Sequence, residues 1–253
     1  MAGHSKWANI KHKKAATDAK RGKAFSKIAK ELTVAARMGG SGDPNTNINL
    51  RPILAKAKAV NMPADNIERA IKKGTGEGAD GTQIEELIYE GYASGGVGVI
   101  VQTLTDNKNR TAAEVRSTFN KHGCSLGQTG SVSRTFQRKG ILVISAEGVE
   151  EEALLEVVME AGAENFEQQG DVWTITCAPT DYNDVSDALE QAGYPALESE
   201  VKLISDLLVD ATDVEHARSV LKFIDALDEL DDVQNVYTNF DVSDEIAEQL
   251  DED

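Results

Sequence analysis

The sequence predicts an α+β protein with three domains, an N-terminal basic three-helix domain followed by two α/β domains, one of them ferredoxin-like. Three observations support this fold class. Apolar residues recur at helical spacing up to residue 73, alternation typical of strands begins at residue 84, and the segment after residue 130 shows a series of strand and helix patterns. We expect the domains at 1–80, at 81–130 together with 206–253 as a discontinuous middle domain, and at 131–205.

The first predicted helix, Lys20 to Arg37, has an apolar face and a cationic face. Phe25, Ile28 and Leu32 recur every three or four residues and line one side of it. Such a helix can pack through one side while it offers ammonium groups to phosphates, although a lysine stripe is also typical of a solvated surface. The stripe lies about 160° around the helix and consists of Lys20, Lys23, Lys27, Lys30 and Arg37.

Two more amphipathic helices, at about Asn49 to Asn61 and Ala64 to Lys73, are expected to complete the basic domain. Pro63 is placed to open the second of them, because proline is tolerated in the first turn of a helix. A glycine-rich linker, Gly74 to Gly81, follows.

Strand and helix patterns alternate in the rest of the chain. Glu85 to Tyr92 and Gly98 to Leu104 are typical of a hairpin, and Asp106, Asn107 or Asn109 can cap the helix after it. The acidic tail, Ser243 to Asp253, is expected to fray. The ferredoxin-like order is predicted from strands at 131–137, 141–145, 165–169, 172–177 and 197–203 and helices at 150–161 and 181–192, and a helix at 214–227 and a strand at 233–239 are expected to complete the middle domain.

Charge is strongly segregated along the chain. The net charge is −17, yet residues 1–73 contain 16 Lys and Arg against 5 Asp and Glu, a balance of +11. Residues 141–253 contain 3 basic and 31 acidic side chains, a balance of −28. Because salt screens charges beyond about 8 Å under physiological conditions, the basic domain is expected to attract a polyanion although the whole chain is acidic.

No motif typical of an enzyme, a metalloprotein or a membrane protein is apparent. The glycines near residue 95 do not match a phosphate-binding loop, and G-x-S-x-G and H-E-x-x-H are missing from the sequence. Cys124 and Cys177 form no metal-binding pair and are expected to be reduced thiols. We therefore expect no catalysis, cofactor, metal, small-molecule substrate or membrane contact, and a cytoplasmic location.

Four segments of the sequence resemble the YebC family: MAGHSKWANIKHKK at the start, NMPADNIERAIKKG at 61–74, YEGYASGGVGVIVQTLTDNKNRT at 89–111 and LGQTGSVSRTF at 126–136. Members of that family are described as probable transcriptional regulators, and a mitochondrial relative is the translational activator of cytochrome c oxidase. The resemblance implies a cytoplasmic protein of three domains that binds nucleic acid, as a DNA-binding regulator or as a ribosome-associated factor that helps translation of difficult sequences. Ala93-Ser94 stands where members commonly have Gly-Pro.

The candidate nucleic-acid-binding residues form two groups. In the first, cations would contact phosphates, and the indole of Trp7 would either stack on a base or pin the arm to the helices. In the second, near residue 110, the side chains either contact nucleic acid or simply cap a helix. The first group is Lys6, Trp7, Lys11, His12, Lys13, Lys14, Lys20, Arg21, Lys23, Lys27 and Lys30, and the second is Asn107, Asn109, Arg110 and Arg116.

Three functions remain open from the sequence. The leading hypothesis is a DNA-binding transcriptional regulator, and the alternative is a translation factor that binds rRNA or the ribosome, since phosphate contacts do not distinguish DNA from RNA. The third is an interaction module whose acidic C-terminal half binds a basic protein. That half could instead mimic nucleic acid and shield the basic helices. No helix-turn-helix reading head is apparent, so weak sequence discrimination is expected.

Overall fold

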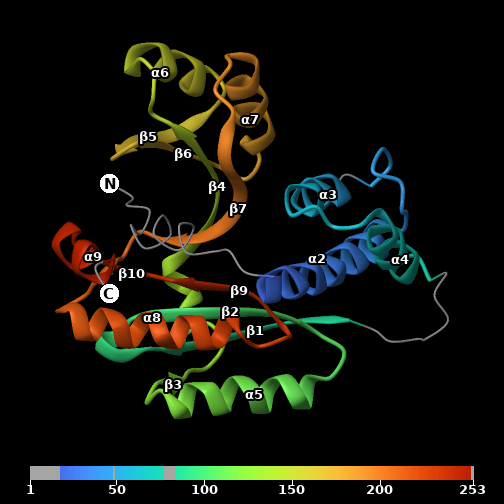
Figure 1. Cartoon of the computed structure of the whole chain (residues 1–253), viewed down its shortest axis with the longest axis vertical. Coiled ribbons are helices and arrows are strands. Elements are labelled where there is room, and N and C mark those ends of the chain that lie inside the picture. Colours follow the sequence, from blue (N-terminus) through green and yellow to red (C-terminus); the bar gives the residue numbers. More distant parts are fainter. Residues whose placement is uncertain (1–17, 48, 77–83, 252–253) are drawn as a thin grey trace. The chain divides into compact units, whose positions relative to one another are not determined.

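A computed structural model describes residues 18–47, 49–76 and 84–251 (Figure 1). The fold class is α+β, as predicted, with antiparallel four-stranded sheets. Within the described residues, the chain divides into two compact units, one formed by 133–208 and the other by the segments before and after it. The second unit contains both the three helices and the first sheet, so the division into three domains stays a prediction.

The N-terminal helices are α2 (Asp18–Gly39), α3 (Leu50–Ala59) and α4 (Ala64–Gly74), close to the predicted bounds. Pro63 is the residue that precedes α4. Ile28 and Leu32 of the predicted apolar face are buried, together with Ala36, in a small core shared by the three helices. Helices α2 and α4 approach closely at Gly74, because a Cβ atom at Gly74 would lie 2.3 Å from the carbonyl oxygen of Thr33.

The first sheet has the strand order β3-β1-β2-β9, all antiparallel. Its strands are β1 (Glu85–Tyr92), β2 (Gly98–Thr105), β3 (Ser125–Leu126) and β9 (Val233–Thr238). A 3₁₀ turn, η1 (Ser94–Gly96), joins β1 to β2, as the predicted hairpin requires. Strand β9 pairs with β2, so a segment from the C-terminal part of the chain completes a sheet that begins at residue 85.

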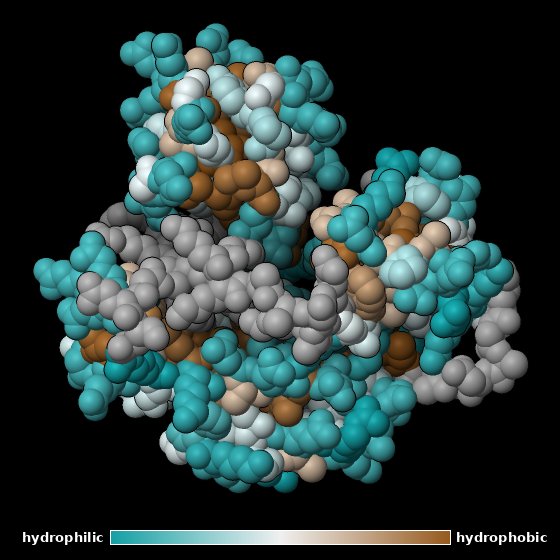
Figure 2. Space-filling model, viewed as in Figure 1, coloured by the Kyte–Doolittle hydropathy of each residue, from teal (hydrophilic) through white to brown (hydrophobic). Residues whose placement is uncertain are grey.

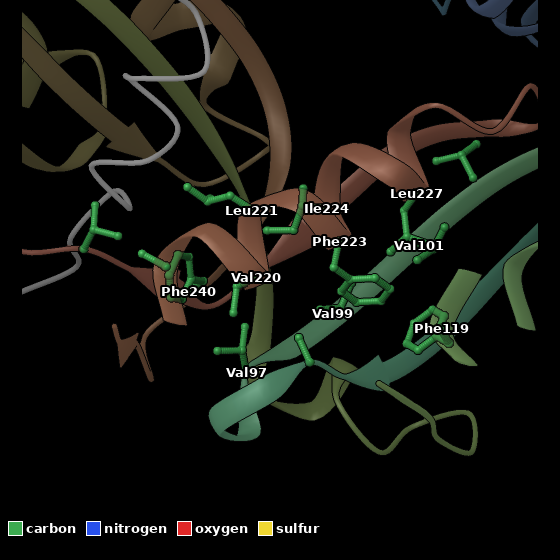
Figure 3. Packing of buried hydrophobic residues seen from close by; sticks show 14 of the residues in the cluster. Val97, Val99, Val101, Phe119, Val220, Leu221, Phe223, Ile224, Leu227 and Phe240 are labelled. Atoms are coloured by element: carbon green, nitrogen blue, oxygen red, sulfur yellow. The ribbon is translucent and has the colours of Figure 1, made fainter. Parts of the chain in front are cut away.

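Two helices, α5 (Lys108–Lys121) and α8 (Val214–Asp228), pack against the same hydrophobic core of this sheet. Figure 3 shows Phe119 and Phe223 turned toward each other beside the valines of β2. Their rings meet edge to face, with centroids 4.8 Å apart. Edge-to-face pairs of this kind add to the stabilisation that burial alone provides.

The unit at 133–208 is ferredoxin-like, as predicted, with the strand order β5-β6-β4-β7. One expectation was wrong: in place of two strands at 131–137 and 141–145, residues 133–135 form a 3₁₀ turn and a single strand, β4, begins at Phe136. Gly140 lies in the middle of this strand, and a Cβ atom there would meet the sulfur of Cys177 at 2.7 Å, so the glycine allows close packing rather than a turn. The elements are η2 (Ser133–Thr135), β4 (Phe136–Ser145), α6 (Glu151–Glu160), β5 (Ala163–Gln169), β6 (Val172–Cys177), α7 (Tyr182–Gln191) and β7 (Ala196–Ser205).

A second expectation was also wrong, because the acidic tail does not fray over the described residues. It forms α9 (Asp244–Asp251), and the hydroxyl of Ser243 accepts a hydrogen bond from the backbone N–H of Ile246 at the start of this helix. Leu250 is buried in the core that α8 also joins, which accounts for the order of the tail. A short parallel pair, β8 (Val209–Asp210) with β10 (Phe240–Asp241), belongs to the same unit and was not predicted.

Hydrophilic residues cover much of the face seen in Figure 2, and brown hydrophobic residues show between them in smaller groups. None of the described helices combines the length and apolar character that crossing a membrane requires. Cys124 and Cys177 are not joined in a disulfide, and burial raises the pKa of the Cys177 thiol to about 11.

The contact between α2 and α4 gives a first test of the helical part. Gly74→Ala is expected to lower the free energy of unfolding by about 2 kcal/mol, because the new methyl group would overlap the backbone of Thr33. Gly22→Ala is the matched control, since nothing lies within 4 Å of a Cβ atom at Gly22. It should raise stability by roughly 0.5–1 kcal/mol. Urea denaturation measures both, and equal effects of the two changes would contradict the close approach.

Candidate nucleic-acid interface

Only part of the predicted basic surface falls within the described residues. The arm residues Lys6, Trp7, Lys11, His12, Lys13 and Lys14 lie outside them. Lys20 and Arg21 lie in the first turns of α2. Lys23, Lys27 and Lys30, the other predicted site residues of α2, have described side chains and define the observable part of the site, and Arg37 of the stripe donates a hydrogen bond to the backbone carbonyl of Ile84.

These three lysines contact carboxylates at the end of α8 and in the segment that follows it. Lys23 pairs with Glu229 at 3.1 Å, and Lys27 pairs with Asp228 at 3.3 Å. Their side chains are only 21% and 19% exposed, so the stripe is partly covered rather than open to solvent. Because the lysines are one helical turn apart, a single acidic segment meets them in succession.

The third pair of the stripe is the most buried. Lys30 donates a 2.8 Å hydrogen bond to a carboxylate oxygen of Asp232 and another of 2.8 Å to the backbone carbonyl of Asp231. The Asp232 side chain is 3% exposed, against 24% for Lys30. A buried carboxylate is costly unless it is fully paired, so Asp232 needs these donors.

Asp232 also accepts hydrogen bonds from three residues around the start of α5. The guanidinium of Arg110 donates to it at 2.8 Å through Nη2 and at 3.3 Å through Nε. The hydroxyls of Thr111 and Thr105 donate at 2.7 Å and 3.1 Å. One carboxylate therefore connects α2, α5 and the end of β2 to the strand β9, which begins at the next residue.

This network shifts the pKa values of Asp232 and Arg110. Burial alone would raise the pKa of Asp232, but the hydrogen bonds from Lys30, Arg110 and Thr111, with the charge of Lys30, outweigh it and lower the pKa from 3.8 to about 2. Hydrogen bonds to Asp232 and then to Asp106 raise the pKa of Arg110. Both groups are therefore charged throughout the physiological range.

The second predicted group lies at the N-terminus of α5. The side chain of Asn107 accepts a hydrogen bond of 3.2 Å from the backbone N–H of Arg110, which is the capping role considered from the sequence. Arg110 pairs with Asp106 and Asp232. Asn109 and Arg116 are exposed. The structure thus assigns structural contacts to two of the four residues and leaves the other two on the surface.

Basic residues of α3 and α4 were not among the predicted site residues, although the sequence shows their charge. Lys58, Arg69 and Lys72 are exposed, and Lys73 is half-buried. Among the described side chains, Lys72 pairs with Glu68 at 2.6 Å, whereas Lys58 and Arg69 form no ion pair. The first turn of α4 also carries Asp65, so this helix does not present a uniformly cationic face.

The described part of the chain contains no group of three His, Cys, Asp or Glu side chains placed to hold a metal ion. The chemistry that the observed arrangement offers is electrostatic. Cations on α2, α3 and α4 are available to bind anions, either the carboxylates that now cover part of α2 or phosphates that would replace them.

Comparison with known proteins gives two family matches in succession along the chain. Residues 5–77 match the description "TACO1/YebC protein N-terminal domain", and residues 84–240 match "TACO1/YebC second and third domain". A protein of Treponema pallidum called a probable transcriptional regulatory protein is 53% identical over 98% of this chain and 100% of its own length. Proteins of the same description from Geobacter sulfurreducens and Corynebacterium glutamicum are 51% and 49% identical over 99% and 100% of this chain and the whole of their own.

The fold is also similar to a solved structure. The crystal structure of a conserved hypothetical protein from Aquifex aeolicus superposes with a TM-score of 0.83 at 48% identity, covering 95% of this chain and 98% of that one. The architecture described above is therefore shared with an experimentally determined relative.

Asp232 provides the test of the network. Asp232→Asn should lower the free energy of unfolding by about 3 kcal/mol at pH 7, because Lys30 and Arg110 lose a buried charged partner. Asp231→Asn removes the same charge from an exposed neighbour and should change stability by less than about 0.5 kcal/mol. Denaturant titration of both variants measures the difference, and equal losses would contradict the special role of Asp232.

The same network makes stability depend on pH. The folded pKa of Asp232 is depressed, so its contribution is present above about pH 5 and is lost as the pH falls toward 2. The stability difference between the unchanged protein and Asp232→Asn should narrow over that range in denaturant titrations. A difference that stays constant from about pH 6 to about pH 2.5 would contradict the role of the charge.

Proposed function

Because the chain belongs to the TACO1/YebC family, we propose that it is a nucleic-acid-binding regulatory protein, and specifically a DNA-binding transcriptional regulator. The descriptions of its relatives support the regulatory role. The observation that supports nucleic-acid binding is the segregation of charge, since residues 1–73 have a balance of +11 within a chain of net charge −17. Such a segment attracts phosphates at short range whatever the total charge.

The contact surface of this proposal is the basic segment with its helices α2, α3 and α4. Its cations would bind the phosphate backbone, which positions a nucleic acid without reading its sequence. Helix α4 is a poor candidate for a recognition helix in the major groove, because Asp65 and Glu68 near its N-terminus would face the phosphates. Binding is therefore proposed to depend mainly on charge, with little discrimination among sequences.

Because lysines of α2 already pair with carboxylates, phosphates of a nucleic acid would have to replace these carboxylates in order to bind. For Lys23 and Lys27 to contact phosphates, they must leave Glu229 and Asp228. Partly exposed ion pairs contribute little free energy, so a phosphate backbone that offers several contacts at once can replace them. The acidic segment then acts as an internal competitor, which fits the shielding role considered from the sequence.

The experiment that tests the proposal measures affinity for single-stranded and duplex DNA and RNA as a function of salt. If about six phosphates are engaged, the logarithm of the association constant should fall with the logarithm of salt with a slope of roughly −5. In parallel, crosslinking in living cells with DNA and RNA readouts and ribosome sedimentation identifies the target. Enrichment at promoters that resists ribonuclease supports the transcriptional role. Crosslinks concentrated in rRNA would establish the translation factor instead. If the protein binds neither single-stranded nor duplex DNA or RNA, the transcriptional and the translational roles are both overturned.

A double substitution tests the exchange. Asp228→Asn with Glu229→Gln removes the carboxylates that pair with Lys27 and Lys23 and should raise affinity for a single strand several-fold at physiological salt. It should also make the salt slope steeper by about 2, because two more cations become available.

The matched control is Asp187→Asn with Glu190→Gln, which changes net charge equally at exposed positions of α7. It should leave the salt slope unchanged. Equal effects of the two double variants would assign the gain to total charge and contradict the exchange.

A further inference from the structure

A cavity of about 300 Å³ lies between α2 and α4, beside the residue that precedes β1. Thr33, which lines the cavity where the two helices meet, donates its hydroxyl to the backbone carbonyls of Ala29 and Ala70. This volume is at the lower limit of small ligand sites, which suits one compact group rather than an extended chain.

The walls of the cavity are apolar and include an aromatic ring. Phe25 and Ala29 line it from α2, Met62 lines it from the turn before α4, and Ile84 lines it from the chain before β1. Phe25 and Ala29 are only partly buried, although they belong to the predicted apolar face of α2. A partly exposed aromatic side chain can serve as a platform on which an unpaired base stacks.

Cations surround the same cavity. Arg69 and Lys73 line it from α4, and Lys30 lines it from α2. Arg69 is exposed, and it forms no ion pair with the side chains that the structure describes. A guanidinium beside an apolar cavity can pair with a phosphate while the rest of the ligand is buried, because its planar donors match phosphate oxygens.

Asn66 adds a neutral polar group to the lining. It is half-buried, and no hydrogen bond from its side-chain amide occurs within the described residues. An amide both donates and accepts, as the edge of a nucleobase does, whereas an acyl chain would leave it unpaired. The aromatic ring of Phe25, the amide of Asn66 and the surrounding cations together match a nucleotide better than a lipid.

From these contacts we propose that the cavity between α2 and α4 receives a single unpaired nucleotide of a nucleic-acid strand. The base enters against Phe25, and Arg69 and Lys73 hold its phosphate. This inference rests on the proposed nucleic-acid binding and adds to it a preference for strands with an unstacked base. It also places the bound nucleotide beside Lys30, whose ammonium group is part of the Asp232 network.

The test uses the full chain and short single strands that carry 2-aminopurine or an abasic residue at one central position. The unchanged protein should bind the 2-aminopurine strand roughly tenfold more tightly than the abasic strand, and the fluorescence of the base should change on binding. Ala29→Phe fills the cavity and should reduce this preference to less than about twofold. Ala55→Phe, at an exposed position of α3 away from the cavity, should keep it.

A second pair of variants guards against misfolding of Ala29→Phe. Asn66→Ala removes the amide that would pair with the edge of the base and should lower the preference for the base several-fold, whereas Lys58→Ala, at an exposed position outside the cavity lining, should weaken binding of both strands by the same factor. The inference would be overturned, while the proposed function stands, if both strands bind in a salt-dependent way with no preference for the base. It would also be overturned if the preference persists in both Ala29→Phe and Asn66→Ala. Loss of all strand binding would overturn both, as would tight binding of free adenosine monophosphate without binding of any strand.

Discussion

The carboxylate of Asp232 is the interaction on which the second unit of the structure depends. It receives the ammonium group of Lys30 from α2 and the guanidinium of Arg110 from α5, and two threonine hydroxyls fill its remaining acceptor positions. A buried carboxylate that lacked any of these partners would be unfavourable. Helices α2 and α5 and the segment that contains Asp232 are therefore stable only in one mutual arrangement. Hydrophobic packing alone specifies position less sharply, because apolar contacts have no direction. The network thus fixes how a basic helix is held against the sheet that β9 completes.

The same contacts explain why the cationic stripe does not behave as a free surface. Lys30 is bound by a buried carboxylate, whereas Lys23 and Lys27 meet carboxylates that are 71% and 26% exposed. Exposed pairs gain little free energy because water and salt screen them. The strength of the ion pairs therefore varies along the stripe. Lys30 is held firmly by Asp232, whereas the partners of Lys27 and Lys23, nearer the start of α2, are more easily exchanged. A phosphate backbone that approached from the N-terminal side would displace the weakest pairs first.

Most of the fold could be predicted from periodicity. The strand Val172–Cys177 and the start of α8 at Val214 coincide with the prediction, because alternation and helical spacing are local signals. The predicted break between the strands at 131–137 and 141–145 includes Gly140, whose role in β4 is to admit the side chains of Cys177 and Tyr182. The tail was judged by its acidity, although Leu250 packs into the core and orders it. Both errors arise from tertiary contacts that local patterns do not contain.

The site was less predictable than the fold for a related reason. Lysine spacing on α2 was visible in the sequence, and so was the acidic segment that contains Asp228, Glu229 and Asp232. The sequence did not show which lysine pairs with which carboxylate. These ion pairs join residues about 200 positions apart, and they depend on the pairing of β9 with β2. Charge composition alone therefore identified a basic and an acidic region and allowed shielding of one by the other as an alternative, but it did not identify the residues that pair. In the folded chain each partly neutralises the other, so the proposed affinity for a polyanion would be set by how strongly phosphates bind relative to the internal ion pairs that they replace, and not by the number of lysines.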